Sequence, residues 1–218
     1  MRTLASFLVG LVLLLGPRSG WCCPLPATGQ TTCWDSSGSV IPCAGTGQDG
    51  DFGEGAPLAY VDNGDGTVTD LNSGLTWEKL SADGTVHDKD NVYTWADAFT
   101  GHVATLNAMN FAGHTDWRLP NVRELQSIVN YQSSNPMVSS AFKTNCAPGC
   151  PATGCSCTAS GNYWSSTSSV SSPSRAWFVS FRYGNVDAFS PSGSKSGAFG
   201  MGSRVQDSEV SPVLLRRV

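Results

Sequence analysis

Charged residues and histidines are both scarce in this chain. The charged residues make up 14% of the sequence, and only three histidines occur in it. His102 and His114 have no serine, cysteine or carboxylate beside them in a recognisable arrangement, so we do not expect either to be catalytic. The sequence also lacks a Ser/His/Asp signature, a phosphate-binding glycine loop and a zinc-protease pattern. We therefore expect no enzyme, no cofactor and no bound metal.

The sequence also contains few long stretches with helical periodicity. The 24 glycines and 12 prolines place turns throughout the 218 residues, which favours a β-rich or α+β domain over a helical bundle. The hydrophobic fraction of 40% is enough for one principal domain with a sizeable core.

No apolar run is long enough to span a membrane comfortably. Residues 1–22 are typical of a secretory signal peptide, because Arg2 precedes the short apolar run Leu4–Leu15. We expect cleavage between Ser19 and Cys23, which leaves a mature chain without a membrane span that is secreted, periplasmic or on the cell surface. An uncleaved anchor stays open because no clean small-x-small site follows, and Cys22 leaves lipidation as a minor alternative.

Cysteine is absent after residue 157, and the eight cysteines of the chain fall into groups. Export to an oxidising compartment makes disulfides the expected form. Cys33 and Cys43 bracket a Gly/Ser-rich loop and are expected to pair, whereas Cys22 and Cys23 stay variable. Four more crowd a short stretch and are expected to pair among themselves: Cys146, Cys150, Cys155 and Cys157. Their spacing matches no common zinc pattern and no histidine lies nearby, so a metal site is the weaker alternative.

Composition divides the mature chain into segments. Residues 23–57 are rich in Gly, Pro and Cys and predict a loosely structured N-terminal segment held by a disulfide. The principal domain is expected over residues 58–205. An insertion over residues 143–161 interrupts it, and its Ser, Gly and Pro content suits an exposed, disulfide-braced loop. Residues 206–218 are then a C-terminal tail.

Turn signals organise the start of the domain. Asn-Gly, Asp-Gly and Ser-Gly pairs separate short β-prone runs over residues 60–79, which predicts three strands in a meander. A calcium loop starting at Asp62 is not expected, because Gly64 and Gly66 stand where ligands belong.

Two helices are predicted. Apolar residues recur at helical spacing between Trp95 and Leu106, and Thr94 is a suitable N-cap. Asn121 and Glu124 have the spacing of a capping box for the second helix. The buried face of this second helix is expected to contain Val122, Leu125, Ile128 and Val129.

The stretch DWRLP immediately precedes the second helix. Trp117 and Leu119 alternate into the core, whereas Arg118 points the other way and could bond loop carbonyls or a carboxylate. We favour a structural anchor for Arg118, with ligand contact as the alternative.

Aromatic and β-branched runs after the insertion predict paired strands, with a turn at Gly184-Asn185. Period-two alternation assigns four residues to the core: Trp164, Trp177, Val179 and Phe181. The same alternation assigns three residues to the opposite face: Phe178, Ser180 and Arg182. A carbohydrate-stacking role for one of the aromatic residues is the alternative.

Five stretches, in order and spacing, resemble the C-terminal domain of the Legionella collagen-like protein, which occurs in many bacterial surface and secreted proteins. The stretches are DNGDGTVTDLNSGLTWEK (62–79), YTWADAF (93–99), AGHTDWRLPNVRELQSIV (112–129), NYWSST (162–167) and AWFVSFRYGNV (176–186). Members usually finish with a strand like V-R-C-V-R, for which Arg204-Val205 is a rough counterpart here.

The resemblance implies both a fold and a class of function. RLP before a helix also looks like the formylglycine-generating sulfatase-modifying enzymes, which implies a C-type-lectin-like α+β fold with two helices, small antiparallel sheets and long loops. Since the family includes an adhesin domain that binds sulfated glycosaminoglycans, the resemblance implies an extracellular binding module or adhesin for acidic or sulfated polysaccharide, host glycans included. The alternative is an enzyme related to sulfatase-modifying factors, whose reactive cysteine pair near the C-terminus has no counterpart after Cys157.

Positive charge is concentrated late in the chain. Residues 31–142 contain fourteen acidic and four basic residues, giving −10, whereas residues 143–218 contain seven basic and three acidic residues, giving +4. The candidate ligand-binding residues are Arg175, Arg182, Lys195 and Arg204. We expect them to present a face to acidic polysaccharide, in a monomer or a homo-oligomer, and a solvated face without a ligand is the alternative. No nucleic-acid partner is expected.

Overall fold

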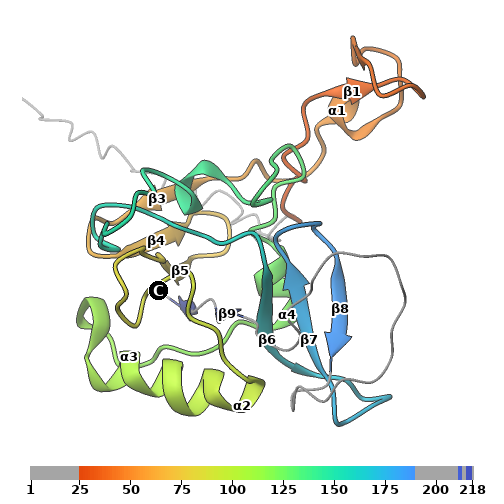
Figure 1. Cartoon of the computed structure of the whole chain (residues 1–218). Coiled ribbons are helices and arrows are strands. Elements are labelled where there is room, and N and C mark those ends of the chain that lie inside the picture. Colours follow the sequence, from red (N-terminus) through yellow and green to blue (C-terminus); the bar gives the residue numbers. More distant parts are fainter. Residues whose placement is uncertain (1–24, 190–210, 213–214, 218) are drawn as a thin grey trace, which may run out of the picture.

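The structure, a computed structural model, describes residues 25–189, 211–212 and 215–217 (Figure 1). These residues form an α+β fold of short helices and small sheets joined by long loops, as predicted. The expected signal peptide lies outside the described residues. Within the described part of the chain, no helix is both long and apolar enough to cross a membrane.

The predicted meander is confirmed as an antiparallel sheet. Its strands are β3 (Tyr60–Asp62), β4 (Thr67–Asp70) and β5 (Leu75–Glu78). A fourth strand, β10 (Leu215–Arg217), pairs antiparallel with β5 and completes the order β10-β5-β4-β3. Residues that composition assigned to a C-terminal tail therefore add a strand to this sheet. The expected counterpart of the family's last strand, Arg204-Val205, lies outside the described residues.

The second sheet contains the strands predicted after the insertion. β6 (Asn162–Ser168), β7 (Ala176–Ser180) and β8 (Val186–Phe189) pair antiparallel in sequence order. The predicted turn between β7 and β8 contains Gly184, whose φ of 72° is accessible to glycine without strain. β9 (Ser211–Pro212) runs parallel to β6, so this sheet is mixed and not purely antiparallel as expected.

The first predicted helix is present and contains a wide turn. It consists of α2 (Trp95–Asp97), the π-helical segment η1 (Ala98–Val103) and α3 (Ala104–Ala108), which follow one another without a break. The side chain of Thr94 accepts a hydrogen bond from the backbone N–H of Asp97 at 3.1 Å, which confirms the predicted N-cap. π-helical turns are rare and often mark functional positions, so the side chains that η1 presents to the interior are of interest.

The second predicted helix, α4 (Val122–Gln126), begins with the expected capping box. The Asn121 side chain accepts from the backbone N–H groups of Arg123 and Glu124, and Glu124 accepts from the N–H of Asn121 at 2.8 Å. The helix ends earlier than its apolar pattern suggests, yet Ile128 and Val129 beyond its end are buried as predicted. Single 3₁₀ turns follow α3 at η2 (Phe111–Gly113) and lie before the insertion at η3 (Ser140–Phe142).

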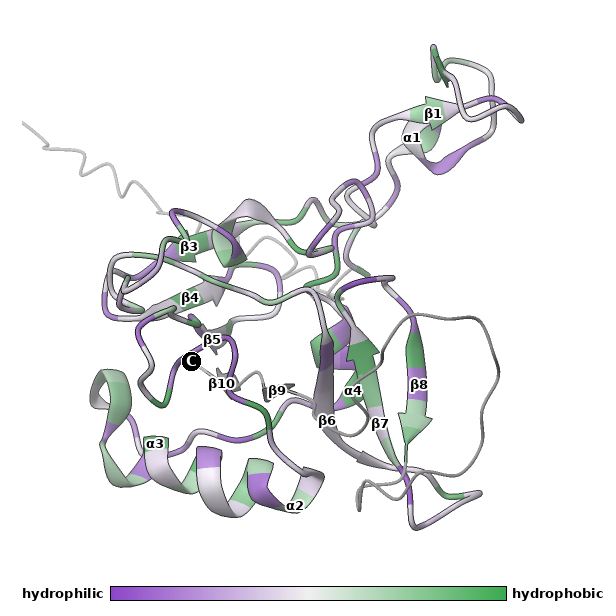
Figure 2. Cartoon of the chain, viewed as in Figure 1, coloured by the Kyte–Doolittle hydropathy of each residue, from purple (hydrophilic) through white to green (hydrophobic). Residues whose placement is uncertain are grey.

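Two hydrophobic clusters lie on opposite faces of β6 and β7. Tyr163 and Val179 are paired across the strands and belong to one cluster, together with Trp77 of β5 and Leu125 of α4. Figure 2 shows the hydrophobic residues along β7 beside α4. The other face forms its own cluster with the α2–α3 helix, through residues that include Trp164, Phe178, Leu106 and Trp117.

This arrangement corrects the predicted orientation of β7. Phe178 was assigned to the face opposite the core, but it is buried because the α2–α3 helix covers that face. Ser180 is buried as well, whereas Trp177, expected in the core, is only half-buried. Of the three residues assigned to the opposite face, Arg182 alone is exposed.

The N-terminal segment forms a small unit that stands away from the two sheets (Figure 1). It contains β1 (Cys33–Trp34), β2 (Val40–Ile41) and the helical turn α1 (Asp49–Phe52), and a disulfide joins Cys33 to Cys43. The side chain of Gln132 accepts hydrogen bonds from the backbone N–H groups of Thr31 and Thr32 at 2.8 and 3.0 Å. The segment is therefore ordered around a hairpin and tied to the main domain.

Candidate functional site

The cysteine-rich insertion lies against the segment that follows β5. Its four sulfurs form two disulfides, Cys146–Cys157 and Cys150–Cys155. The backbone N–H of Cys157 donates to the carbonyl of Leu80, and the carbonyl of Cys150 accepts from the N–H of Ala82. Cys155 and Cys157 are buried. The expectation of an exposed loop thus holds for only part of the insertion, because its last cysteines pack against the domain.

A cavity of about 520 Å³ opens beside the Cys146–Cys157 disulfide. Residues from three segments meet at this cavity: the loop after β5, the loop before η3 and the insertion itself. Polar side chains make up much of the lining: Lys89, Asp90, Asn135, Lys143, Thr158 and Ser160. Ammonium, amide and hydroxyl groups at one cavity can bind a ligand that carries both charge and hydroxyls.

The lining of this cavity carries a surplus positive charge. Lys89 is 2.5 Å from a carboxylate oxygen of Asp90, so these two charges offset one another. The ammonium of Lys143 donates to Ser133 Oγ and to the carbonyls of Ser134 and Pro136, which are all neutral. Among the described residues, no carboxylate lies within ion-pair distance of Lys143. Because its charge is not offset there, the cavity favours an anionic ligand.

Arg175 and Arg182, the two predicted cationic residues in the described part of the chain, do not form one compact patch. Arg175 is exposed immediately before β7, and Arg182 is exposed beyond the other end of the same strand. The five residues of β7 alone separate them by about 16 Å at the rise of an extended strand. The Arg182 guanidinium lies over the ring of Tyr183, 5.1 Å from its centre. Lys195 and Arg204 lie outside the described residues.

Arg118 is held by its own loop and helix. Its two terminal nitrogens donate to the carboxylate of Glu124 at 3.0 and 2.9 Å, and one of them also donates to the carbonyl of Leu119. Glu124 is also the carboxylate of the capping box. Arg118 therefore reinforces the start of α4, which is the structural role that its position predicts.

A buried carboxylate with two histidine partners was missed by sequence reasoning. Glu78, at the end of β5, is 2.6 Å from His87 Nδ1 through one oxygen and 2.9 Å from His102 Nε2 through the other. Burial alone would raise the pKa of Glu78, but the neighbouring His102 and His87 outweigh burial and lower that pKa below its ordinary value. No local motif signals this cluster, because its members come from a strand, a loop and the η1 segment.

The cluster borders a second, more apolar cavity of about 350 Å³. The ring of His87 packs at a tilt of 39° against that of Phe111, with 4.3 Å between the ring centres. Both residues line this cavity together with Pro151 and Ala152 of the insertion. His102 is buried, and its Nδ1 has no hydrogen-bond partner among the residues that the structure describes. Glu78 thereby bridges β5, the His87 loop and the helix.

Comparison with known families places these features in one domain. The sequence model of the Lcl C-terminal domain family matches residues 66–199, more than half of the chain. The chain belongs to this family. No curated protein and no solved structure matches the chain significantly. The matched residues of this Lcl C-terminal domain include both cavities, β5 to β8 and the whole insertion. A bacterial extracellular domain with disulfides is consistent with a secreted or cell-surface protein.

Proposed function

We propose that this Lcl C-terminal domain is a non-enzymatic extracellular binding module, with a C-type-lectin-like fold, that recognises acidic or sulfated polysaccharide. The observation that carries the proposal is the cavity beside the insertion, where no described carboxylate lies within ion-pair distance of Lys143. In the main domain, the two predicted helices, the two four-stranded sheets and the long loops support the lectin-like architecture.

The cavity has the size and chemistry that such a ligand needs. Its volume of about 520 Å³ falls within the range of small-ligand sites. A sulfate or carboxylate group would be attracted by the positive charge of Lys143, and Lys89 could donate charge-assisted hydrogen bonds to it. Sugar hydroxyls would complement Asn135, Thr158 and Ser160, whose side chains both donate and accept.

Exposed arginines outside the cavity suit a polymeric ligand. Arg175 and Arg182 lie at opposite ends of β7, so each would contact a different anionic group along a polysaccharide chain. Contacts of this kind are individually weak and gain strength when several act on one chain or in one oligomer. The cavity then supplies the specific contact and the arginines supply additional attraction.

Heparin affinity chromatography of the mature chain over a salt gradient tests the proposal. Lys89→Gln, Lys143→Gln and the double variant remove positive charge from the cavity, and Arg123→Gln is the matched control, because Arg123 is exposed on α4 and does not line the cavity. We expect the double variant to elute at clearly lower salt than wild type, and the control to elute with wild type.

Two results would count against this function. If wild type passes through the column at low salt, the domain does not bind sulfated polysaccharide. If the double variant elutes with wild type while its thermal unfolding is unchanged, the cavity is not the binding site. Lys143 also supports the Ser133–Pro136 loop, so Lys143→Gln could destabilise the fold. If it unfolds at a lower temperature than wild type, the elution of Lys89→Gln alone decides the test.

A further inference from the structure

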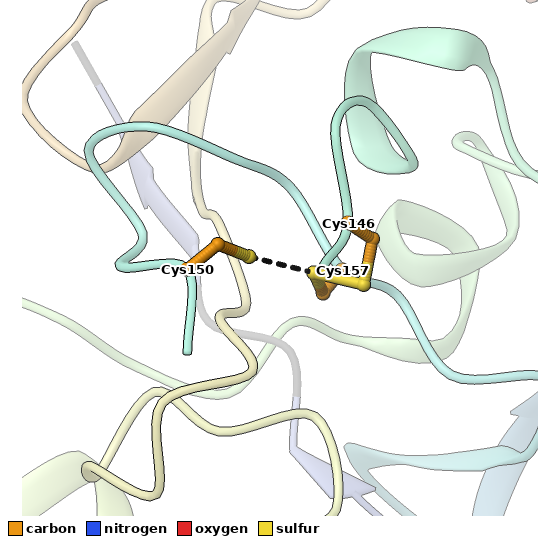
Figure 3. Close-up of side chains that lie close together, drawn as sticks. All are labelled: Cys146, Cys150 and Cys157. Atoms are coloured by element: carbon orange, nitrogen blue, oxygen red, sulfur yellow. Dashed lines mark hydrogen bonds between the residues drawn. A yellow bond between two sulfur atoms is a disulfide. The ribbon is translucent and has the colours of Figure 1, made fainter. Parts of the chain in front are cut away.

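The sulfur atoms of the insertion contact one another across the two disulfides. Cys150 Sγ lies 3.5 Å from Cys157 Sγ, and Cys155 Sγ lies 3.7 Å from the same atom. Cys157 is bonded to Cys146, so its sulfur touches both members of the other disulfide. In Figure 3 the sulfur of Cys157 lies between those of Cys150 and Cys146.

We propose that the insertion is a thiol–disulfide exchange site in which Cys157 bonds either to Cys146 or to Cys150. The partner that starts the exchange is an extracellular dithiol, either a small molecule or a protein. This inference concerns the insertion itself and does not depend on polysaccharide binding.

Accessibility decides where such a dithiol enters. Cys146 is exposed and Cys150 is half-buried, whereas Cys155 and Cys157 are buried. A thiolate from outside can therefore reach Cys150 or Cys146, but not the two buried sulfurs. Cys150 is the entry point that matters here, because its own sulfur is next to Cys157.

The chemistry balances in two stages. One thiolate of the dithiol attacks Cys150 Sγ and Cys155 leaves as a thiolate; the second thiolate of the dithiol then resolves the mixed disulfide and frees the Cys150 thiolate. The dithiol is oxidised to its disulfide, and Cys150–Cys155 is reduced. In the second stage the Cys150 thiolate attacks Cys157 Sγ, the Cys146–Cys157 bond breaks, and Cys146 leaves as a thiolate that takes a proton from water. This stage consumes no electrons.

The exchange would place a reactive group at an accessible position. Cys146 and Cys157 both line the cavity that contains Lys143, so the released Cys146 thiol would lie at its wall. The Cys33–Cys43 disulfide is the natural reference, because it belongs to the separate N-terminal unit and its sulfurs contact no other cysteine among the described residues.

The first experiment uses the Cys155→Ser variant of the mature chain. This change leaves Cys150 as a free thiol beside the Cys146–Cys157 bond. Samples are quenched in acid and unfolded in guanidinium chloride, so that buried thiols are also accessible. Free thiols are then blocked with N-ethylmaleimide, and the remaining cysteines are reduced and labelled with iodoacetamide. Trypsin cleaves after Lys143 and Arg175, so one peptide carries every cysteine of the insertion and fragment-ion sequencing locates each label.

We expect the N-ethylmaleimide label to divide between Cys150 and Cys146 in this variant, with Cys146 labelling severalfold above wild type. The matched control is Cys43→Ser, in which the free Cys33 should take the label and the insertion should stay unlabelled. Label on Cys150 alone, at every pH between neutral and mildly alkaline, would overturn the proposal.

A second experiment keeps the proposal testable should Cys155→Ser misfold. Wild type is treated with limiting dithiothreitol, quenched at intervals and labelled in the same way. Joint labelling of Cys146 and Cys155, before Cys33 or Cys43 reacts, shows that the bond has moved to Cys150–Cys157. Reduction that never yields this pair of labels contradicts the exchange.

Discussion

The Nε2 atom of His102 lies 2.9 Å from a carboxylate oxygen of Glu78, and both residues are buried. This contact joins the end of β5 to the π-helical segment η1, so it fixes the helix to the sheet through one polar bond inside an apolar region. The other carboxylate oxygen bonds His87 in the loop after β5. Three segments that are separate in the sequence therefore depend on a single side chain.

Replacing the carboxylate of Glu78 should destabilise the fold. We expect Glu78→Gln to lower the free energy of unfolding by about 3 kcal/mol, because removing the charge of a buried pair leaves its partners without compensation. Urea unfolding at neutral pH measures the change. Glu54→Gln is the control, since Glu54 is exposed and should change stability little. A loss no larger than that of the control would show that Glu78 does not hold the helix.

The same variant predicts a dependence on pH. The folded-state pKa of Glu78 lies below its ordinary value of 4.5, so ionised Glu78 contributes stability above that value and loses it as the pH falls through the folded pKa. The stability difference between wild type and Glu78→Gln should shrink in acid, as the pH falls through the folded-state pKa of Glu78. Comparing the two proteins at each pH removes the effect of the other carboxylates. A stability difference that grows as the pH falls would show that the folded-state pKa of Glu78 is raised, not lowered.

Features that depend on neighbouring residues could be predicted from the sequence, whereas contacts between distant segments could not. The N-caps Thr94 and Asn121 were predictable because each acts on backbone groups within three residues. The Glu78–His102 contact spans 24 residues and exists only once the helix has packed against the sheet. Phe178 was misassigned for a related reason: period-two alternation identifies two faces of a strand, but not that a helix covers the second one.

The role of Arg118 gives a second prediction. Arg118→Ala should lower the free energy of unfolding by at most about 1 kcal/mol, because the Arg118 side chain is 44% exposed and solvent screens its pair with Glu124. Urea unfolding measures this, with Arg118→Lys as a control that keeps the charge but not the paired contacts. Heparin retention should be unchanged. A folded Arg118→Ala variant that no longer binds heparin would instead make Arg118 a ligand contact.

Two neighbouring glycines allow a third prediction. Gly64 and Gly66 both have positive φ, of 76° and 97°, but a Cβ on Gly66 would approach the ring of Phe111 at 3.0 Å, whereas one on Gly64 would meet nothing within 4 Å. Both alanine variants should be strained, and Gly66→Ala should be less stable than Gly64→Ala by roughly 1 kcal/mol, typical of a small overpacking contact. Thermal unfolding of the two variants measures this difference. Equal stability of the two variants would mean that the ring moves aside without cost.

The last prediction concerns the cationic residues that sequence placed on the binding face. Arg175→Ala and Arg182→Ala should each reduce the salt concentration at which the protein elutes from heparin, because each would remove a proposed contact with an anionic group of the polysaccharide. Since the two residues lie at opposite ends of β7, without a shared partner among the described contacts, their effects on binding free energy should add. The triple variant with Lys195→Ala should elute earliest.

The binding of sulfated oligosaccharides of increasing length distinguishes two separate arginine contacts from a single compact patch. A short sulfated fragment that reaches one end of β7 should respond to one arginine variant, whereas a long chain should respond to both, because only the long chain can contact both ends. Competition against heparin elution measures the two cases. If the triple variant elutes at the same salt as wild type, these residues form a solvated face without a ligand. If short and long chains respond alike to both variants, the arginines act on one shared site in spite of their separation along the strand.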